Sequence, residues 1–236
     1  MSETSEQAGS LPFGFSSTVQ SMKSSSKCTI GDVGLREAKR ERTRQAIADA
    51  AMRLFVTRGF DAVTVSEIAA AADVSVKTVF NYFPTKEDIF FDEAPERERA
   101  LIAFVRERRE GESIVGAIHR MQSAHCGRMA SEGFAHFARV IEASPALQAK
   151  ELDLMARFTD LLASAIREEL GAHEVDAKIA ANLLMSVHWE LFRNARRLAV
   201  EGRHGPAAAR RLRADLDRAY RLLEHGLGSL EAPIAD

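Results

Sequence analysis

The sequence predicts an all-α protein with a small N-terminal three-helix domain that contains a helix-turn-helix, followed by a larger helical domain. Three observations lead to this class. Apolar residues recur at steps of three and four from Arg36 almost to the C-terminus, the alternation typical of β-strands is absent, and helix-capping residues follow one another at short intervals. Hydrophobic residues make up 46% of the 236 residues, which is enough for a packed core.

The N-terminal segment, residues 1–34, is rich in Ser, Thr, Gly and Gln. It cannot bury enough apolar surface to offset the entropy lost on ordering, so we expect a disordered arm. This arm is either a plain tail or a segment that touches DNA through Lys23 and Lys27. The C-terminal residues 231–236 are expected to form a short tail.

The expected location is the cytoplasm, without membrane contact. The N-terminus lacks the basic and apolar regions of a secretory signal, and no apolar run approaches the roughly 18 residues that cross a bilayer. Cys28 and Cys126 match no disulfide framework or paired metal spacing, which suits a reducing compartment.

The first helix is expected to end near Arg58. Gly59 then supplies the residue that can adopt a left-handed conformation after a helix, and Phe60 is placed to pack back on it. The apolar stripe of this helix is made of Ile47, Ala50, Ala51, Leu54 and Phe55.

Three capping signals follow. Thr64 with Glu67 forms a capping box for a second helix, Ser75 is a good N-cap for a third helix that runs to about Phe83, and Thr85 with Asp88 repeats the box for a fourth. This spacing gives two short helices joined by a turn of three or four residues, as in a helix-turn-helix. The fourth helix is expected to continue and to bend near Pro95.

About five further helices are expected beyond Glu110, because weaker breaks occur near Gly111, Gly133, Ser144-Pro145, Gly171 and Gly202–Gly205. Three apolar stripes stand out in this region. They are Leu154, Phe158, Leu161 and Ala165; then Val175, Ile179, Leu183, Val187 and Leu191; then Leu212, Leu216, Tyr220, Leu223 and Leu227.

The third helix has a polar outer face. Val79 and Phe83, four residues apart, are expected to face inward. This leaves outward a set that can contact base edges and phosphates: Lys77, Thr78, Asn81 and Tyr82. Residues 36–86 carry nine Lys/Arg against six Asp/Glu, a balance of +3, whereas residues 87–236 have twenty-one against twenty-five, a balance of −4. A basic first domain favours a polyanionic partner.

The sequence resembles the tetracycline-repressor family through the run from Thr64 to Ala69 and the run from Val74 to Asp88. The resemblance implies a DNA-binding domain at 35–90 and a ligand-binding and dimerisation domain at 91–230. It further implies that double-stranded operator DNA is contacted by Thr64, Ser66, Val76, Lys77, Thr78, Asn81, Tyr82 and Lys86. Phe80 departs from the family pattern, in which tyrosine is common.

The implied regulator is a homodimeric, ligand-responsive repressor that needs no cofactor or metal. The effector is expected to be a small, largely apolar molecule. Its candidate contacts are Phe104, Met121, His125, Met129, Phe158 and Trp189. The histidines available as polar partners are His119, His125, His136 and His188. The candidate dimer seam consists of Trp189, Leu191, Leu216, Leu223 and Leu227.

Two alternatives remain. The chain is a DNA-binding regulator without a ligand, or it is a helical thiol enzyme that uses Cys126 with a nearby histidine. The sequence contains none of the common zinc, phosphate-loop or nucleophile-elbow motifs, so an enzyme is not expected. In the favoured reading, a ligand pushes the fourth helix, which runs from the DNA-binding domain through Leu101 and Phe104 into the second domain.

Overall fold

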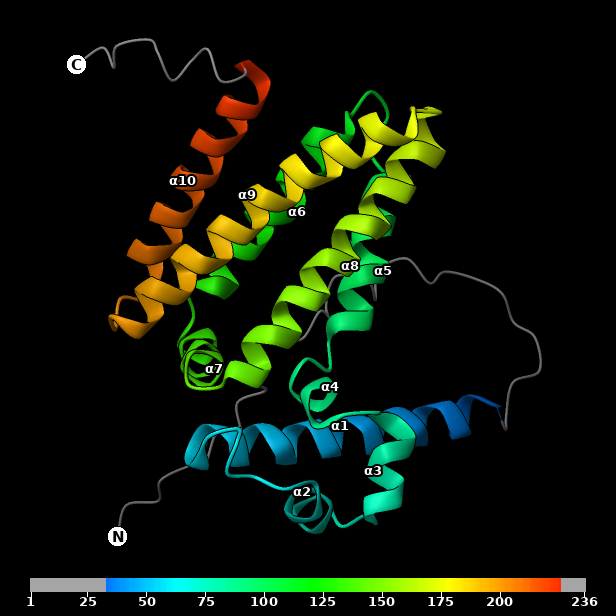
Figure 1. The fold of residues 1–236 in the computed structure, drawn as a ribbon, viewed down its shortest axis with the longest axis vertical. Helices are drawn as coiled ribbons and strands as arrows, with labels where there is room; N and C mark the ends of the chain where they lie inside the picture. The colour runs from blue at the N-terminus through cyan, green and yellow to red at the C-terminus, as the bar shows by residue number, and fades with distance from the viewer. Residues whose placement is uncertain (1–32, 226–236) are drawn as a thin grey trace, which may run out of the picture.

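The computed structural model describes residues 33–225, which form ten helices and contain no β-strand (Figure 1). In chain order these are α1 Val33–Arg58, α2 Val65–Ala71, α3 Val76–Tyr82, α4 Lys86–Phe90, α5 Ala94–Arg106, α6 Ile114–Met129, α7 Glu132–Glu142, α8 Pro145–Leu170, α9 Glu174–Val200 and α10 Pro206–His225. The predicted all-α class is confirmed. The expected C-terminal tail and the arm up to residue 32 lie outside the described residues, whereas residues 33 and 34 already belong to α1.

The first four helices form a small unit at one end of the molecule. α1 runs across it, and α2 and α3 lie beneath α1 in Figure 1. The inner face of α1 is buried at Ile47, Ala51 and Phe55, where it meets Ile68 of α2 and Val79 of α3. Burial of these side chains holds the two short helices in place, since full enclosure of each isoleucine, phenylalanine or valine stabilises the fold by about 1.5 to 3 kcal/mol.

The end of α1 is as the sequence predicts. Gly59 has φ +82°, and its N–H donates to the carbonyl of Phe55 at 2.9 Å. The ring of Phe60 then returns to lie 4.9 Å from that of Phe55. A side chain at position 59 would strain this left-handed turn, so glycine is the residue that permits it.

The predicted caps are also present. Thr64 Oγ1 accepts from the N–H of Glu67, whose carboxylate accepts from the N–H of Thr64 at 2.8 Å, which completes a capping box. Ser75 Oγ accepts from the N–H of Thr78 at 3.0 Å. Thr85 and Asp88 form a second box at the start of α4. Each cap satisfies backbone donors that the first helical turn leaves without partners.

The turn between α2 and α3 contains a feature that the sequence analysis did not find. Asp73 has φ +53°, the left-handed region, which aspartate tolerates better than most residues. The N–H of the next residue, Val74, donates to the carbonyl of Ala69 at 3.0 Å. This closes the turn and sets the direction in which α3 leaves α2.

Two expectations about helix breaks were wrong. The fourth helix does not bend and continue: α4 ends at Phe90, and a turn over residues 91–93 separates it from α5. Pro95 occupies the first turn of α5, because its missing N–H is tolerated only there and its ring would clash with the carbonyl four residues earlier. The next break lies at Ala130 rather than at Gly133, since Ser131 caps α7 and places Gly133 in its first turn.

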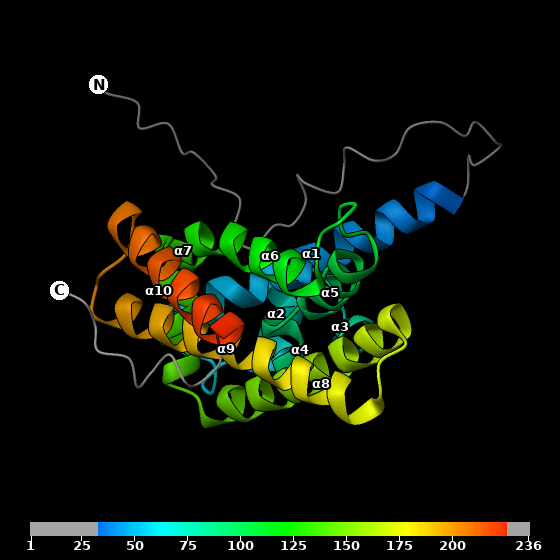
Figure 2. The ribbon, with the colours of Figure 1, turned by 90° about the horizontal axis from the view of Figure 1, so that it is seen from above.

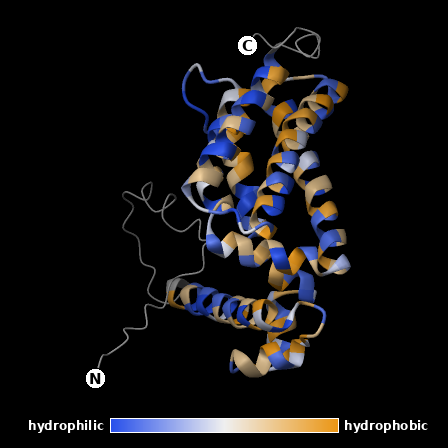
Figure 3. Cartoon of the chain, turned by 90° about the vertical axis from the view of Figure 1, so that its left-hand side faces the viewer, coloured by the Kyte–Doolittle hydropathy of each residue, from blue (hydrophilic) through white to orange (hydrophobic). Residues whose placement is uncertain are grey.

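The larger unit is built around the long antiparallel helices α8 and α9. α5 packs on α8, α7 crosses the end of the pair, and α10 packs on both α6 and α9 (Figure 2). The five helices expected beyond Glu110 are confirmed. Their interior includes the fully buried Phe134, Ile141, Leu147 and Leu162. Hydrophobic and hydrophilic residues both occur along the helices in Figure 3, as expected for helices with one buried and one exposed face.

Candidate functional site

The recognition helix α3 presents the polar face that the sequence predicts. Val79 and Phe83 are buried, whereas Lys77 and Asn81 are exposed. Phe80 is also 49% exposed, which is unusual for a large aromatic side chain in a small unit. An exposed apolar side chain beside polar ones suits contact with a thymine methyl group in the major groove.

Other predicted DNA contacts surround this face. Val76 begins α3 and is partly exposed, while Thr78 and Tyr82 are half-buried. The Thr78 hydroxyl shares a 2.8 Å hydrogen bond with Ser75 Oγ. The guanidinium of Arg40 lies 5.9 Å from the centre of the Tyr82 ring, so α1 steadies the end of α3.

Two predicted contacts lie on the start of α2. Ser66 is exposed on the first turn of α2, and the capping box there is formed by Thr64 and Glu67. Thr64 uses its hydroxyl to donate to Glu67 Oε2 at 2.8 Å. Hydrogen bonds from the Thr64 N–H and from Arg58 lower the pKa of Glu67 to about 2. Thr64 therefore has a clear structural role in addition to the predicted DNA contact.

Lys86 is held within the protein. Its Nζ donates to the carbonyls of Phe60 and Val63, both at 3.0 Å, and lies 4.1 Å from the centre of the Phe60 ring. The ammonium has three donors, so one remains for a phosphate oxygen. Lys86 thus ties the start of α4 to the turn between α1 and α2, a role that sequence spacing did not reveal.

Contacts between the two units converge on the turn over residues 91–93. Arg44 of α1 donates to both the carbonyl and Oδ2 of Asp92, each at 3.2 Å. Burial raises the pKa of Asp92 to about 6, against the opposing effect of Arg44. Phe90 stacks on Phe137 of α7 with ring centres 4.6 Å apart. The small N-terminal unit is therefore joined to the larger unit by specific contacts at this turn, which we call the hinge.

Two small cavities of about 80 and 70 Å³ adjoin this hinge, and residues from α5, α8 and α9 line both. Of the predicted ligand contacts, Met121, His125 and Met129 line the first cavity, Trp189 lines the second, and Phe158 lines both. The structure brings these five together.

Phe104 lines neither cavity, so the placement expected for it was wrong. Its ring lies under the guanidinium of Arg120, 5.1 Å from the ring centre. Arg120 is itself held by two hydrogen bonds to Glu112, at 2.9 and 2.8 Å. Phe104 lies one turn beyond Ala100, which does line the first cavity, and its ring contacts α6 through Arg120.

The sequence analysis missed the charged residues of the cavities. Glu93, Arg97 and Arg128 line the first, and an ion pair of 3.4 Å joins Arg97 to Glu93. Burial raises the pKa of Glu93 to about 7. Burial, followed by the charge of Arg97, lowers the pKa of Arg128. The sequence signal that could have indicated a charged cavity is the presence of charged residues on the inner faces of α5 and α6.

Among the four candidate histidines, only His125 and His188 line a cavity. Nδ1 of His188 is buried and has no hydrogen-bond partner among the described residues. Burial and the nearby Arg97 lower the pKa of this imidazole to about 4, so it is neutral at pH 7. His119 instead bonds to Asp217 of α10 at 2.9 Å.

The thiol of Cys126 is buried, and its weak hydrogen bond goes to the carbonyl of Gln122 at 3.6 Å. Burial raises the pKa of this thiol, the opposite of what a nucleophilic cysteine requires. Within residues 33–225, no group of three or more His, Cys, Asp or Glu side chains is placed to hold a metal ion. No helix in the same range is long and apolar enough to cross a membrane.

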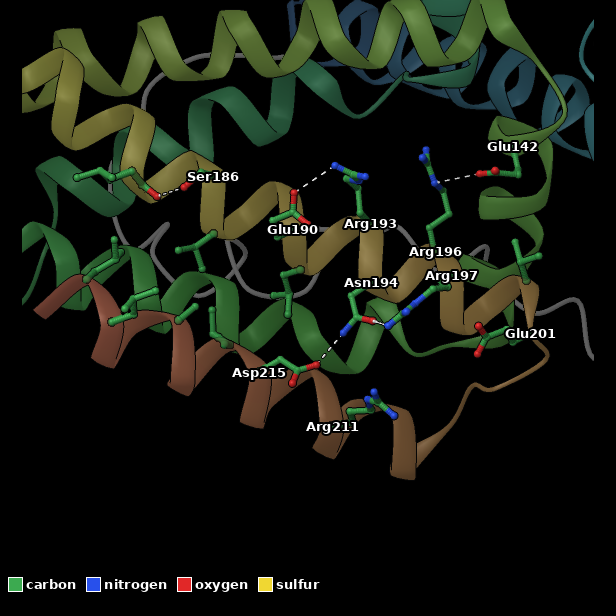
Figure 4. Close-up of a pocket in the computed structure, with 18 residues that line it drawn as sticks. Glu142, Ser186, Glu190, Arg193, Asn194, Arg196, Arg197, Glu201, Arg211 and Asp215 are labelled. Carbon is green, nitrogen blue, oxygen red and sulfur yellow. Dashed lines mark hydrogen bonds and ion pairs between the residues drawn. The ribbon is translucent and has the colours of Figure 1, made fainter. Parts of the chain in front are cut away.

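A groove of about 1270 Å³ runs between α9 and α10 (Figure 4). Leu191 and Leu216 form its floor but are buried within the subunit, and Leu223 lies at its edge. Trp189 faces the opposite side of α9 and lines the second cavity, so its expected place in a dimer seam was wrong. Leu227 lies outside the described residues.

Three of the four large apolar residues that remain exposed on α9 belong to its first half, and the fourth, Val200, ends the helix. Val175, Ile179 and Leu183 lie at four-residue spacing and are 56%, 54% and 50% exposed. Further along, polar side chains pair with one another, as Asn194 does with Asp215 at 2.7 Å (Figure 4). The stripe expected to run from residue 175 to 191 is therefore outward at its start and buried at its end.

A short helix-turn-helix with an exposed recognition helix, joined through a hinge to a larger helical unit, defines a helix-turn-helix regulator. Residues 47–92 match the family model described as bacterial regulatory proteins of the tetR family. The chain is 30% identical over 155 residues to the HTH-type transcriptional regulator TcmR of Streptomyces glaucescens, a match covering 62% of this chain and 69% of that protein. The chain belongs to the TetR family of transcriptional regulators.

Further relatives agree with this assignment. The HTH-type transcriptional regulator LuxR of Vibrio harveyi is 46% identical over 59 residues, or 22% of this chain and 29% of that protein. Thermus thermophilus FadR, a TetR-family repressor solved with lauroyl-CoA, is 26% identical, with a TM-score of 0.52 over 82% of this chain and 99% of that one. Native NalD of Pseudomonas aeruginosa shares the fold, with a TM-score of 0.55 over 77% and 96% of the chains at 18% identity.

Proposed function

We propose that this regulator is a repressor that binds a palindromic operator as a homodimer and is released when a small molecule fills the two cavities. The observation that carries the proposal is at the hinge. Glu93 lines both cavities, and its neighbour Asp92 is bonded to Arg44 in the DNA-binding unit. A ligand that moves Glu93 must also disturb the contact that orients α1.

The direction of this effect follows from linkage. A ligand lowers operator affinity only if it binds the DNA-free arrangement better, and operator DNA then weakens ligand binding by the same factor. A coupling free energy of about 1 to 3 kcal/mol corresponds to roughly 5- to 150-fold release. The hinge replaces the continuous fourth helix as the proposed path, because α4 ends at Phe90.

The proposed domain boundary lies at this hinge, with DNA binding assigned to residues 35–90 and ligand binding and dimerisation to residues 91–230. DNA as a partner implies a cytoplasmic location.

The structure of Thermus thermophilus FadR, solved with lauroyl-CoA, supports a small-molecule effector. Cavities of about 80 and 70 Å³ are below the roughly 300 Å³ of ordinary ligand pockets, so the effector is compact or the cavities open around it.

The proposed dimer joins the α9 and α10 faces of two subunits around a two-fold axis. The supporting observation is the exposed stripe Val175, Ile179 and Leu183, because three large apolar side chains at helical spacing are costly to leave in water. The groove between α9 and α10 continues from this stripe at Leu183.

The test begins with selection of duplexes from a random DNA library by the full-length protein. We expect a palindrome whose half-sites lie about one helical turn, roughly 34 to 36 Å, apart, with an affinity that falls as salt rises. The selected duplex is then used to screen small molecules that release it from the protein. Fluorescence anisotropy of the labelled duplex measures this release. Selection of no palindromic sequence would contradict the proposal.

A regulator without a small-molecule effector is the second candidate, and the small size of the cavities favours it. In that case no compound would alter operator affinity. Enlarging the second cavity by Trp189→Ala would then change stability but leave DNA binding unresponsive to every compound in the screen.

A further inference from the structure

The first cavity has an unusual wall for an apolar pocket. Arg97 of α5, Arg128 of α6 and His188 of α9 reach it from three different helices. The Nδ1 atom of His188 is buried there without a hydrogen-bond partner among the described residues. A buried polar atom without a hydrogen-bond partner is unfavourable, so a site that keeps one in a cavity wall is suited to a ligand that completes the bond.

The charge around this cavity is unbalanced. Among the described lining residues, Glu93 is the only acid, and it faces two guanidinium groups. The proximity of Arg97 and Arg128 to each other is unfavourable, since the charge of Arg97 contributes to lowering the pKa of Arg128. A second negative group would relieve this repulsion.

We propose that the effector is a hydrophobic carboxylic acid whose carboxylate binds between Arg97 and Arg128 and accepts a hydrogen bond from the ring of His188. This inference rests on the proposed effector function and specifies the chemistry of its ligand. Guanidinium groups bind carboxylates in a planar, two-pronged geometry that an ammonium group does not provide.

The body of the acid fits the remaining walls. Met121, Met129, Phe158, Met185 and Phe192 supply adaptable thioethers and aromatic rings. The two cavities share Phe158 and Phe192, and together they approach the cavity of roughly 150 Å³ that holds one benzene ring in an engineered protein core. An acid with one aromatic ring, or a short aliphatic chain, matches this size.

Glu93 competes with the ligand for Arg97. When the ligand carboxylate binds, Glu93 loses its ion pair beside a new negative charge and takes up a proton. Acid binding therefore weakens as the pH rises from 6 to 8, by up to about tenfold per unit above the pKa of Glu93. The other titratable groups near the site are Arg44 of α1, Asp92 of the hinge, Glu96 of α5, His125 of α6 and Glu151 of α8.

The experiment uses matched pairs of acids and uncharged amides: benzoate with benzamide, phenylacetate with phenylacetamide, and octanoate with octanamide. Binding to the full-length protein is followed by the fluorescence of Trp189, the one tryptophan in the chain, which lines the second cavity. We expect at least one acid to bind about 10- to 100-fold more tightly than its amide, as two charge-assisted hydrogen bonds allow.

Three variants identify the site. Arg128→Gln should remove most of the preference for the acid. Glu93→Gln, which removes the competing carboxylate, should tighten acid binding by about tenfold at pH 8 and abolish its pH dependence. Arg99→Gln makes the same charge change as Arg128→Gln on an exposed position of α5 and should leave binding unchanged. The expected gain in Glu93→Gln keeps the test decisive even if Arg128→Gln is poorly folded.

The outcomes separate this inference from the proposed function. If no acid binds more tightly than its amide, or if Glu93→Gln weakens acid binding, the carboxylate site is wrong. If amides and acids bind equally and both release operator DNA, the effector function stands and only the acid specificity fails. If acids bind selectively but operator affinity does not change, the site stands and its regulatory role fails.

Discussion

Lys77 lies at the start of α3 and Lys86 at the start of α4, and the surroundings of the two ammonium groups differ. Lys77 is exposed on α3, whereas the Lys86 ammonium bonds to two carbonyls in the turn between α1 and α2. Lys77→Ala should reduce affinity by about 1 to 3 kcal/mol at particular base pairs and leave thermal stability unchanged. Lys86→Ala should lower both the melting temperature and the affinity for all sequences. Fluorescence anisotropy on operator and random duplexes, with thermal unfolding, distinguishes the two. An unchanged melting temperature in Lys86→Ala would refute the internal role.

The carboxyl group of Glu93 makes stability depend on pH in a direction opposite to that of a salt-bridged surface acid. Burial raises its pKa from 4.5 to about 7, so between these values the folded state keeps a proton that the unfolded state releases. Stability from this group is fully present below pH 4.5 and is lost as the pH rises through about 7. Glu93→Gln should therefore stabilise the protein by about 2 kcal/mol at pH 8 and hardly at all at pH 4.5. Urea unfolding at the two pH values measures this, and equal effects at both would contradict it.

His188 makes stability depend on pH in the opposite direction. Its pKa is lowered to about 4, so its contribution is present above pH 6.5 and is lost as the pH falls toward 4. Between about pH 4.5 and 6.5 the stability lost at Glu93 is offset by the stability gained at His188, so the combined contribution of these two groups is greatest in that range.

At the scale of the elements, the caps of the short helices carry much of their stability, since a seven-residue helix is marginal alone. Ser75→Ala removes the hydroxyl that accepts from the N–H of Thr78 and should cost about 1 kcal/mol. Ser66→Ala is the matched control, because Ser66 lies in the first turn of α2, where Thr64 is the capping residue. Guanidinium unfolding should separate the two variants; similar losses would argue against the cap.

The same elements show which features are readable from sequence. The ends of α1, α2 and α3 and the start of α4 could be predicted because caps, Gly59 and Pro84 act on backbone groups within a few residues. Phe158, an apolar residue of both cavities, lies on one of the predicted apolar stripes. The charged residues of the cavities could not be predicted, because whether Glu93 and Arg97 point into a cavity depends on how α5 packs against α8, which is a tertiary property. The break at Ala130 precedes the predicted one because the Ser131 hydroxyl caps α7, which places Gly133 in its first turn.

At the scale of the whole molecule, the exposed stripe on α9 predicts a dimer that a single charge disrupts. Leu183→Glu should raise the dimer dissociation constant by about 100-fold or more, because burying an unpaired carboxylate at an interface costs several kcal/mol. Leu152→Glu, on an exposed apolar position of α8, is the control and should leave the dimer intact. Sedimentation velocity measures both. A stable wild-type monomer at micromolar concentration would contradict the prediction.

Leu216 shows why the position of that charge matters. Its side chain is fully buried within the subunit, so Leu216→Glu should unfold the protein rather than yield a folded monomer. Circular dichroism together with sedimentation distinguishes a dissociated subunit from an unfolded one. A folded monomer of Leu216→Glu would mean that the floor of the groove opens on dissociation.

The contacts across the hinge also limit how the two units can be recombined. Asp61 accepts from Ser144 at 2.8 Å, Asp88 pairs with Lys150 at 2.9 Å, and Phe90 stacks on Phe137 in the middle of α7. A hybrid regulator cut at residue 90 and grafted onto a foreign effector domain would leave both aspartates facing arbitrary side chains. Such a graft requires at least that Ser144 and Lys150 are transplanted with the DNA-binding unit. The two units of this chain therefore cannot be exchanged independently of each other.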